Sequence, residues 1–119
     1  MRAPIDIAAN YLDLWNADQD ADRRRLLENW SADASYRDPL MQADGRDGVA
    51  SMIAGARAQF PGHVFALHGT PDGHGHCARF SWTLRPDGGS PVAAGTDIVR
   101  LDAEGRIVEV LDFLDPVAA

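Results

Sequence analysis

The sequence contains no lysine, and all 11 of its basic residues are arginine. Schiff-base chemistry and the phosphate-binding lysine of a P-loop are therefore excluded, because each needs a primary amine on a flexible stem. Acidic residues outnumber the arginines, with 18 Asp and Glu and a formal net charge of -7. A nucleic-acid surface needs clustered positive charge to neutralise phosphates, so nucleic acid is not an expected partner.

Cysteine and long apolar runs are equally scarce. The single Cys77 cannot form an intrachain disulfide, and no spacing of cysteine and histidine suggests structural zinc. No apolar run approaches the roughly 20 residues needed to span a bilayer, and residues 1–6 lack the apolar core of a secretory signal. We therefore expect a cytoplasmic protein that does not contact membranes. A chain of 119 residues, 45% of them hydrophobic, fits one globular domain over residues 1–119.

Apolar residues follow a helical period in the first half of the chain and alternate in the second. Spacings of three and four predict helices over residues 4–16, 20–30 and 46–60. An extended segment is expected at 35–39, because Pro39 disfavours helical backbone at Asp38. Alternation between turn sequences predicts strands over residues 63–68, 76–84, 92–101 and 107–114. This order predicts an α+β fold in which helices cover one face of a curved sheet.

Two acidic residues fall on predicted inward faces of strands. Along its strand, Asp97 shares a face with Val99 and Leu101, while Arg100 lies on the opposite face. If Arg100 faces solvent, Asp97 faces inward. Asp112 is opposite in parity to Glu109 and is expected to face inward for the same reason. A buried carboxyl without a charge partner stays neutral and becomes a hydrogen-bond donor, which some enzymes use. The alternative for both residues is an acid at a strand edge, exposed by a bulge.

A third acid, Asp38, stands at the end of the extended segment with its backbone restricted by Pro39. The fixed Asp-Pro geometry presents its side chain at the end of a strand edge. The alternative is a turn-forming aspartate, which is common before proline.

Several short motifs occur in an order and spacing typical of one superfamily. They are Tyr11 followed by Leu-Asp-Leu-Trp-Asn-Ala-Asp, then Tyr36-Arg37-Asp38-Pro39, Gly45, Thr96-Asp97-Ile98-Val99-Arg100-Leu101 and Arg106-Ile107-Val108-Glu109. Over nearly its whole length the chain resembles the NTF2-like superfamily, and within it the ketosteroid isomerase and SnoaL-like polyketide cyclase branches. This resemblance implies a cone-shaped fold: three N-terminal helices packed on a curved, mostly antiparallel sheet that encloses a pocket.

The resemblance also implies roles for four residues. In the isomerase pattern Asp38 matches the general base, while Tyr11 and a protonated Asp97 match the two donors to the substrate oxyanion. The cyclase pattern places its acid–base pair at Asp112 and at the position of Asp97, where it prefers histidine. The sequence therefore departs from the cyclase pattern at Asp97 and from the isomerase pattern at Asp112, a position that is usually apolar in isomerases.

The same fold implies a pocket lined by apolar and aromatic side chains. The expected substrate-binding residues are Trp15, Met41, His76, Phe80, Trp82, Val99, Val110 and Leu114. No metal is expected, because His74 and His76 have no third ligand nearby, and no cofactor is implied.

These residues predict a small cofactor-independent isomerase or cyclase that uses carboxylate acid–base chemistry on a hydrophobic carbonyl compound. The alternative is a non-catalytic module for ligand binding or dimerisation, since one fold serves many functions. Both faces of the last strand are largely apolar, so a homodimer formed through the sheet is expected as well.

Overall fold

The structure is a computed structural model and describes residues 2–117, which form three α-helices, one 3-10 turn and six strands. The elements follow in this order: α1 (Pro4–Asn16), α2 (Asp20–Leu26), η1 (Leu27–Asn29), β1 (Trp30–Arg37), β2 (Gln42–Asp44), α3 (Gly45–Gln59), β3 (His63–His74), β4 (Cys77–Pro86), β5 (Ala93–Leu101) and β6 (Ile107–Asp115). No helix in this part of the chain has the length and apolar character needed to cross a membrane.

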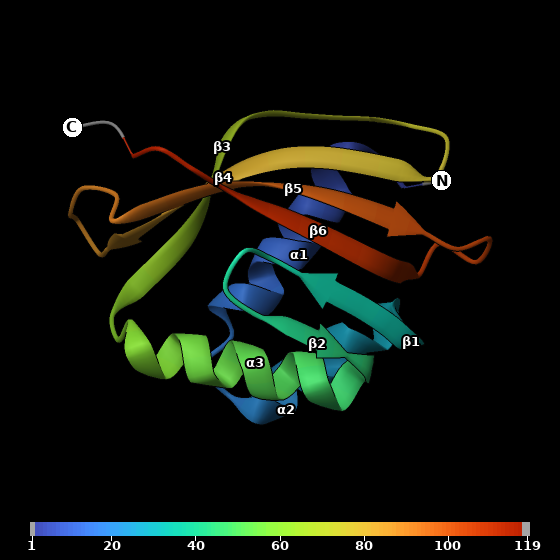
Figure 1. Cartoon of the computed structure of the whole chain (residues 1–119), viewed down its shortest axis with the longest axis horizontal. Helices are drawn as coiled ribbons and strands as arrows, with labels where there is room; N and C mark the ends of the chain where they lie inside the picture. Colours follow the sequence, from blue (N-terminus) through green and yellow to red (C-terminus); the bar gives the residue numbers. More distant parts are fainter. Residues whose placement is uncertain (1, 118–119) are drawn as a thin grey trace.

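The strands form one mixed, curved sheet in the order β2-β1-β6-β5-β4-β3. Only the β1–β6 pair is parallel among the described strands, and the other neighbours are antiparallel. In Figure 1 strands β3 to β6 lie above α3, and α1 runs behind them. Helix α1 packs mainly on β3 and β4, while α3 packs on β1 and β2. The predicted α+β cone, with helices on one face of a mostly antiparallel sheet, is confirmed.

The boundary between α2 and β1 differs from the prediction. The apolar spacing of Leu26, Leu27 and Trp30 suggested a helix up to Trp30, but the helix ends at Leu26 and Trp30 begins β1. Trp30 is 2% exposed and pairs with Ile107 in the sheet, while its carbonyl accepts hydrogen bonds from the Arg46 guanidinium. Sheet pairing has overridden the local helical pattern.

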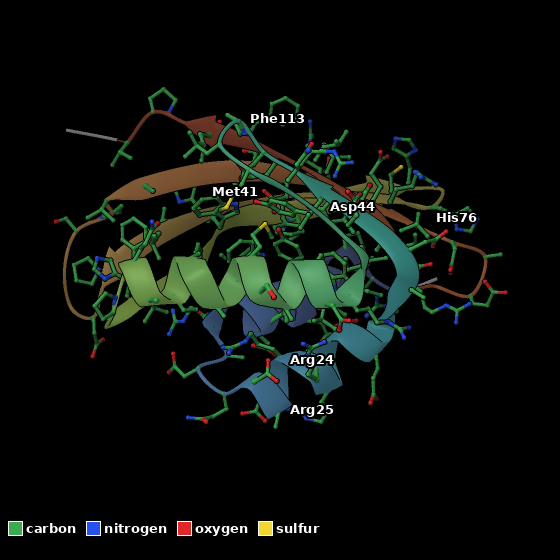
Figure 2. All side chains as sticks on the ribbon, turned by 60° about the horizontal axis from the view of Figure 1, so that its bottom comes forward. Arg24, Arg25, Met41, Asp44, His76 and Phe113 are labelled. Carbon is green, nitrogen blue, oxygen red and sulfur yellow. The ribbon has the colours of Figure 1, made fainter. Side chains whose placement is uncertain are left out.

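The start of β4 also differs, and this affects a predicted site residue. His76 was expected on the strand, but the β3–β4 turn includes Gly75, whose φ of 54° places it in the left-handed region. The chain therefore still turns at His76, and β4 begins at Cys77. His76 is exposed and lies at the periphery in Figure 2, so it does not line the pocket.

Gly95, which has no side chain, leaves space on the concave face of the sheet for the ring of Trp82. It pairs with Trp82 across β4 and β5, and the indole covers it. A Cβ built on Gly95 would lie 2.6 Å from Cε2 of Trp82 and 2.8 Å from the Phe113 carbonyl oxygen. Neither the buried ring nor the sheet backbone can move away easily, so only glycine fits here.

Gly95→Ala is therefore expected to lower the free energy of unfolding by about 1–3 kcal/mol, through overpacking against Trp82. The matched control is Gly55→Ala in α3, where an added Cβ meets nothing within 4 Å. That change is expected to be neutral or to stabilise by up to about 1 kcal/mol, because alanine favours helix more than glycine. Urea denaturation followed by circular dichroism measures both. Equal effects at the two positions would contradict the packing argument.

Candidate active site

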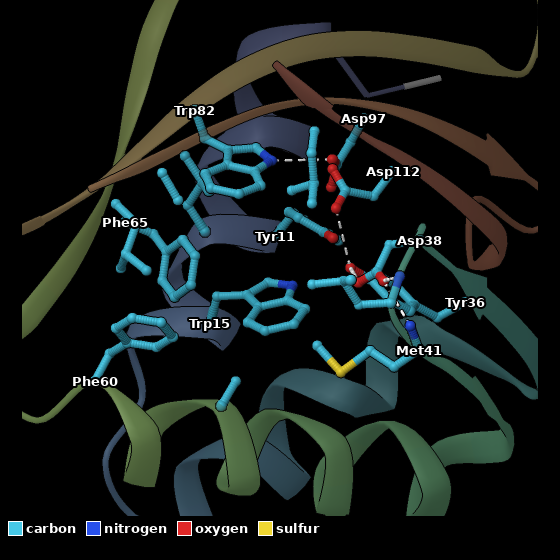
Figure 3. A pocket seen from close by; sticks show the side chains of 16 residues that line it. Tyr11, Trp15, Tyr36, Asp38, Met41, Phe60, Phe65, Trp82, Asp97 and Asp112 are labelled. Carbon is cyan, nitrogen blue, oxygen red and sulfur yellow. Dashed lines mark hydrogen bonds between the residues drawn. The ribbon is translucent and has the colours of Figure 1, made fainter. Parts of the chain in front are cut away.

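A pocket opens between the concave face of the sheet and the helices α1 and α3 (Figure 3). Its volume is about 160 Å³. A cavity of about 150 Å³ holds benzene, so this pocket accommodates a compact molecule such as a single ring. The lining residues are Tyr11, Leu12, Trp15, Tyr36, Asp38, Leu40, Met41, Ala56, Phe60, Phe65, Trp82, Leu84, Ala93, Asp97, Asp112 and Leu114. All of its charged residues are aspartates.

Asp97 and Asp112 form a pair of carboxyls at one end of this pocket. They are directly opposite each other on β5 and β6, and their exposed fractions are 1% and 6%. Asp97 Oδ1 accepts a hydrogen bond of 3.0 Å from the Trp82 indole nitrogen. Asp97 Oδ2 and Asp112 Oδ1 have no other donor among the described residues, so a proton shared between the two carboxyls satisfies both.

The electrostatics of the pair follow from this placement. Burial, and then the neighbouring Asp97, raise the pKa of Asp112 to about 9. Burial also raises the pKa of Asp97, although donors such as Tyr11 and Trp82 oppose that shift. Two carboxylates this close cannot both ionise near neutral pH, so the pair holds at least one proton there.

Tyr36 connects the pair to Asp38 at the same end of the pocket. Its hydroxyl oxygen lies 2.7 Å from Asp38 Oδ2 and 3.3 Å from Asp112 Oδ2. The other oxygen of Asp38, Oδ1, accepts hydrogen bonds from the backbone nitrogens of Leu40 (2.7 Å) and Met41 (2.8 Å). Asp38 therefore shapes the β1–β2 turn, as its alternative interpretation predicted, and also lines the pocket.

Tyr11 presents its hydroxyl to the same end of the pocket from α1 (Figure 3). Its ring stacks on Trp30 at a centroid distance of 6.2 Å and meets Phe80 edge-on at 5.2 Å. Burial, and then the charge of Asp97, raise the pKa of Tyr11 well above 10. The hydroxyl therefore stays protonated over the physiological range and acts as a hydrogen-bond donor.

The structure brings together eight of the twelve predicted site residues. Asp38, Tyr11, Asp97 and Asp112 converge on one pocket, and its walls include Trp15, Met41, Trp82 and Leu114. His76 lies outside the pocket for the reason given above. Phe80, Val99 and Val110 do point inward, but they are 0–2% exposed and do not line the pocket. Phe80 is covered by Tyr11, and Val99 pairs with Val110 across the sheet, so these three belong to the core.

Tyr36 is the most informative residue that the sequence analysis did not assign to the site. It was part of the recognised motif, but no role was given to its side chain. Alternation along β1 could have found it, because residues 36 and 38 share one face of an extended chain. Phe60 and Phe65 were not predicted as site residues either. They line the pocket from either side of the turn between α3 and β3.

A family model for the SnoaL-like domain matches residues 8–110. A search of curated proteins gave no match. A candidate isomerase of the SnoaL-like family from Agrobacterium tumefaciens is 50% identical over 94% of this chain and 97% of its own, with a TM-score of 0.91. Two more distant structures share the fold. An NTF2-like protein of unknown function from Exiguobacterium is 22% identical over 92% of this chain and 98% of its own (TM-score 0.73). A candidate polyketide cyclase from Sinorhizobium meliloti is 23% identical over 90% of this chain and 93% of its own (TM-score 0.70). The chain belongs to the SnoaL-like family of the NTF2-like superfamily.

Proposed function

We propose that the protein is a small cofactor-independent isomerase or cyclase that acts on a hydrophobic carbonyl compound. The observation that carries this proposal is the convergence of three carboxyls and a buried tyrosine at one end of an apolar pocket. The family relative from Agrobacterium tumefaciens, itself a candidate isomerase, supports the same class of reaction. The pocket volume favours a compact substrate such as a monocyclic carbonyl compound.

Each polar group has a role in such a reaction. The Asp38 carboxylate removes a proton from the carbon next to the substrate carbonyl, and the C–H electron pair moves to form an enolate. The Tyr11 hydroxyl and the protonated Asp97 donate hydrogen bonds to the enolate oxygen, which stabilises the developing charge. An isomerase then returns the proton to another carbon. In a cyclase, the enolate carbon instead attacks a second carbonyl, and an acid protonates the resulting alkoxide.

Asp112 suits the role of an acid better than that of a base. Its pKa of about 9 means that the carboxyl is mostly protonated at neutral pH. A base must be ionised to accept a proton, so Asp38 is the stronger candidate for this step.

One observation favours the alternative of a non-catalytic ligand-binding module. Both oxygens of Asp38 already accept hydrogen bonds, from Tyr36 and from the backbone of the β1–β2 turn. A carboxylate held in this way also suits a purely structural role beneath an apolar ligand site. Thermal-shift screening against carbonyl compounds, together with turnover assays, separates the two functions: binding without turnover supports the module.

The decisive assay compares wild type with Tyr11→Phe on a β,γ-unsaturated ketone for isomerisation and on a diketone for aldol cyclisation. Phenylalanine keeps the ring contacts with Trp30 and Phe80 but removes the oxyanion donor. We expect kcat to fall about a hundredfold, with KM changing less and the unfolding free energy within about 1.5 kcal/mol of wild type. An unchanged kcat would remove Tyr11 from the mechanism.

We also propose that the outer face of the sheet binds a second copy of the chain. On β6 this face presents Leu111 and Phe113, which are 37% and 57% exposed, and Ile98 pairs with Leu111 beside them. An ion pair of 3.3 Å between Arg100 and Glu109 borders this apolar centre. A two-fold interface needs a self-complementary patch, and an apolar centre bordered by both charge signs provides one.

Phe113→Asp is expected to weaken this dimer at least tenfold, because it places a charge at the centre of the buried patch. The control is Val92→Asp, which changes an apolar side chain of similar exposure (50%) in the segment before β5. Analytical ultracentrifugation over a concentration series measures both constants. A wild type that sediments as a monomer throughout, or equal effects of the two changes, would contradict the proposal.

A further inference from the structure

Four side chains form a continuous polar chain along the end of the pocket. Hydrogen bonds link Asp38 to Tyr36 and Tyr36 to Asp112, and Asp112 lies opposite Asp97 across β6 and β5 (Figure 3). Asp38 is half-buried, while Tyr36 is 2%, Asp112 6% and Asp97 1% exposed. The inner three groups are therefore shielded from water, and their polar atoms must satisfy one another.

Counting protons along this chain constrains its charge. Two of its links are hydrogen bonds, Asp38 with Tyr36 and Tyr36 with Asp112, and the third is the cross-strand pair of Asp112 and Asp97, whose facing oxygens have no other partner among the described residues. Each contact needs one hydrogen, and the Tyr36 hydroxyl supplies only one. Ionised carboxylates only accept, so two of the three carboxyls must be protonated. The polar chain of these four side chains therefore carries a single negative charge.

That charge has two resting places. In the first arrangement Asp97 donates to Asp112, Asp112 donates to Tyr36, and Tyr36 donates to an ionised Asp38. In the second arrangement every proton has shifted by one contact: Asp38 donates to Tyr36, Tyr36 to Asp112, and Asp112 to an ionised Asp97. The two arrangements contain the same atoms and the same number of protons, and the same oxygens stay paired.

Hydrogen-bond donors that do not belong to the four-residue polar chain lie at both of its ends, and none lies at its middle carboxyl among the described residues. The Leu40 and Met41 backbone nitrogens hold the charge when it lies on Asp38. The Trp82 indole nitrogen holds it when it lies on Asp97, and the Tyr11 hydroxyl points to the same end of the pocket. Asp112 Oδ1 has no such donor among the described residues, and the pocket lining includes no arginine or histidine. The negative charge is therefore stabilised at the ends and not at Asp112.

We propose that Asp38, Tyr36, Asp112 and Asp97 form an internal proton relay in which Tyr36 is the bridge between the base and the acid of the site. The relay rests on the proposed function for its catalytic purpose. In the cyclase reaction, Asp38 takes a proton from substrate carbon, the enolate carbon bonds to the second carbonyl, and Asp97 gives a proton to the resulting alkoxide. The site is then left with a neutral Asp38 and an ionised Asp97. Three proton transfers then restore the starting state: Asp38 to Tyr36, Tyr36 to Asp112, and Asp112 to Asp97. No proton needs to enter from solvent between turnovers.

The relay predicts that a change at residue 38 alters the ionisation of Asp97, and that Tyr36 transmits this effect. In Asp38→Asn the amide donates to the Tyr36 oxygen, so Tyr36 must donate to Asp112, and Asp112 to Asp97. The negative charge is then confined to Asp97. In Tyr36→Phe the connection is broken, and the same change at residue 38 reaches Asp97 only through space.

Carbon-13 NMR of the aspartate carboxyl carbons tests this in four proteins: wild type, Asp38→Asn, Tyr36→Phe and the double variant. We expect Asp38→Asn to raise the ionisation constant of Asp97 at least tenfold when Tyr36 is present, and by less than about threefold in the Tyr36→Phe background. Equal responses in the two backgrounds would overturn the relay.

Two arms keep this test independent of other failures. If Tyr36→Phe does not fold, wild type against Asp38→Asn remains decisive: an Asp97 that stays protonated at neutral pH in Asp38→Asn overturns the proposal. The readout requires no substrate, so a protein that shows the coupling without any turnover would refute the proposed enzyme and leave the relay standing. Turnover without the coupling would do the reverse.

Discussion

The Asp38→Asn variant is expected to fold like wild type and to turn over its carbonyl substrate about 10²–10⁴-fold more slowly, the range that a positioned general base contributes. Asparagine has nearly the same shape, and its carbonyl oxygen can keep accepting from the Leu40 and Met41 nitrogens that define the β1–β2 turn. It cannot accept a proton from carbon. The loss is therefore expected in kcat, measured at saturating substrate, and the unfolding free energy is expected to change by less than about 1.5 kcal/mol.

The matched control is Asp44→Asn, which removes the same charge from the end of β2. Asp44 is exposed and pairs with Arg37 at 3.1 Å, outside the pocket lining. Its substitution is expected to leave kcat within about twofold of wild type, because an exposed ion pair contributes little. If Asp38→Asn and Asp44→Asn turn over substrate at the same rate, Asp38 serves only to cap its own turn.

The inward orientation of Asp97 and Asp112 was predictable from sequence, and its consequence was not. Alternation along a strand assigns each residue to a face, and both acids lie on the concave face as their parity indicated. That the two stand directly opposite each other depends on the register of β5 against β6. Register arises from turn geometry and long-range packing, and the sequence pattern of one strand does not contain it.

The contact of Tyr36 also depends on a strand pairing that the sequence pattern does not predict. Its parity with Asp38 was visible, but its contact with Asp112 requires β1 to lie parallel to β6, a pairing of residues 76 positions apart. The errors at Trp30 and His76 also have tertiary or conformational causes. Trp30 left its helical pattern to pair with Ile107, and the left-handed Gly75 extended the turn to His76.

Asp112→Asn is expected to flatten the dependence of stability on pH, and this is the largest effect on stability that the structure predicts. The pKa of Asp112 is about 9 in the folded protein, against about 3.9 in an unfolded chain. Between those values the native state binds one more proton than the unfolded state. The unfolding free energy of wild type therefore falls as pH rises, by up to about 1.4 kcal/mol per pH unit, and levels off above about pH 9.

The asparagine side chain resembles the protonated acid at every pH, because it is neutral and its amide can still donate a hydrogen bond within the buried site. As pH rises from about 5 to about 8, the difference in unfolding free energy between the variant and wild type is expected to shift by about 2–4 kcal/mol in favour of the variant. Urea titrations at the two pH values measure this shift. Asp13→Asn, at an exposed position on α1, is the control and should change the slope little. A wild type whose stability rises over this interval would show that Asp112 is ionised in the native state. In that case Asp112, and not Asp38, would be the carboxylate available to accept the substrate proton.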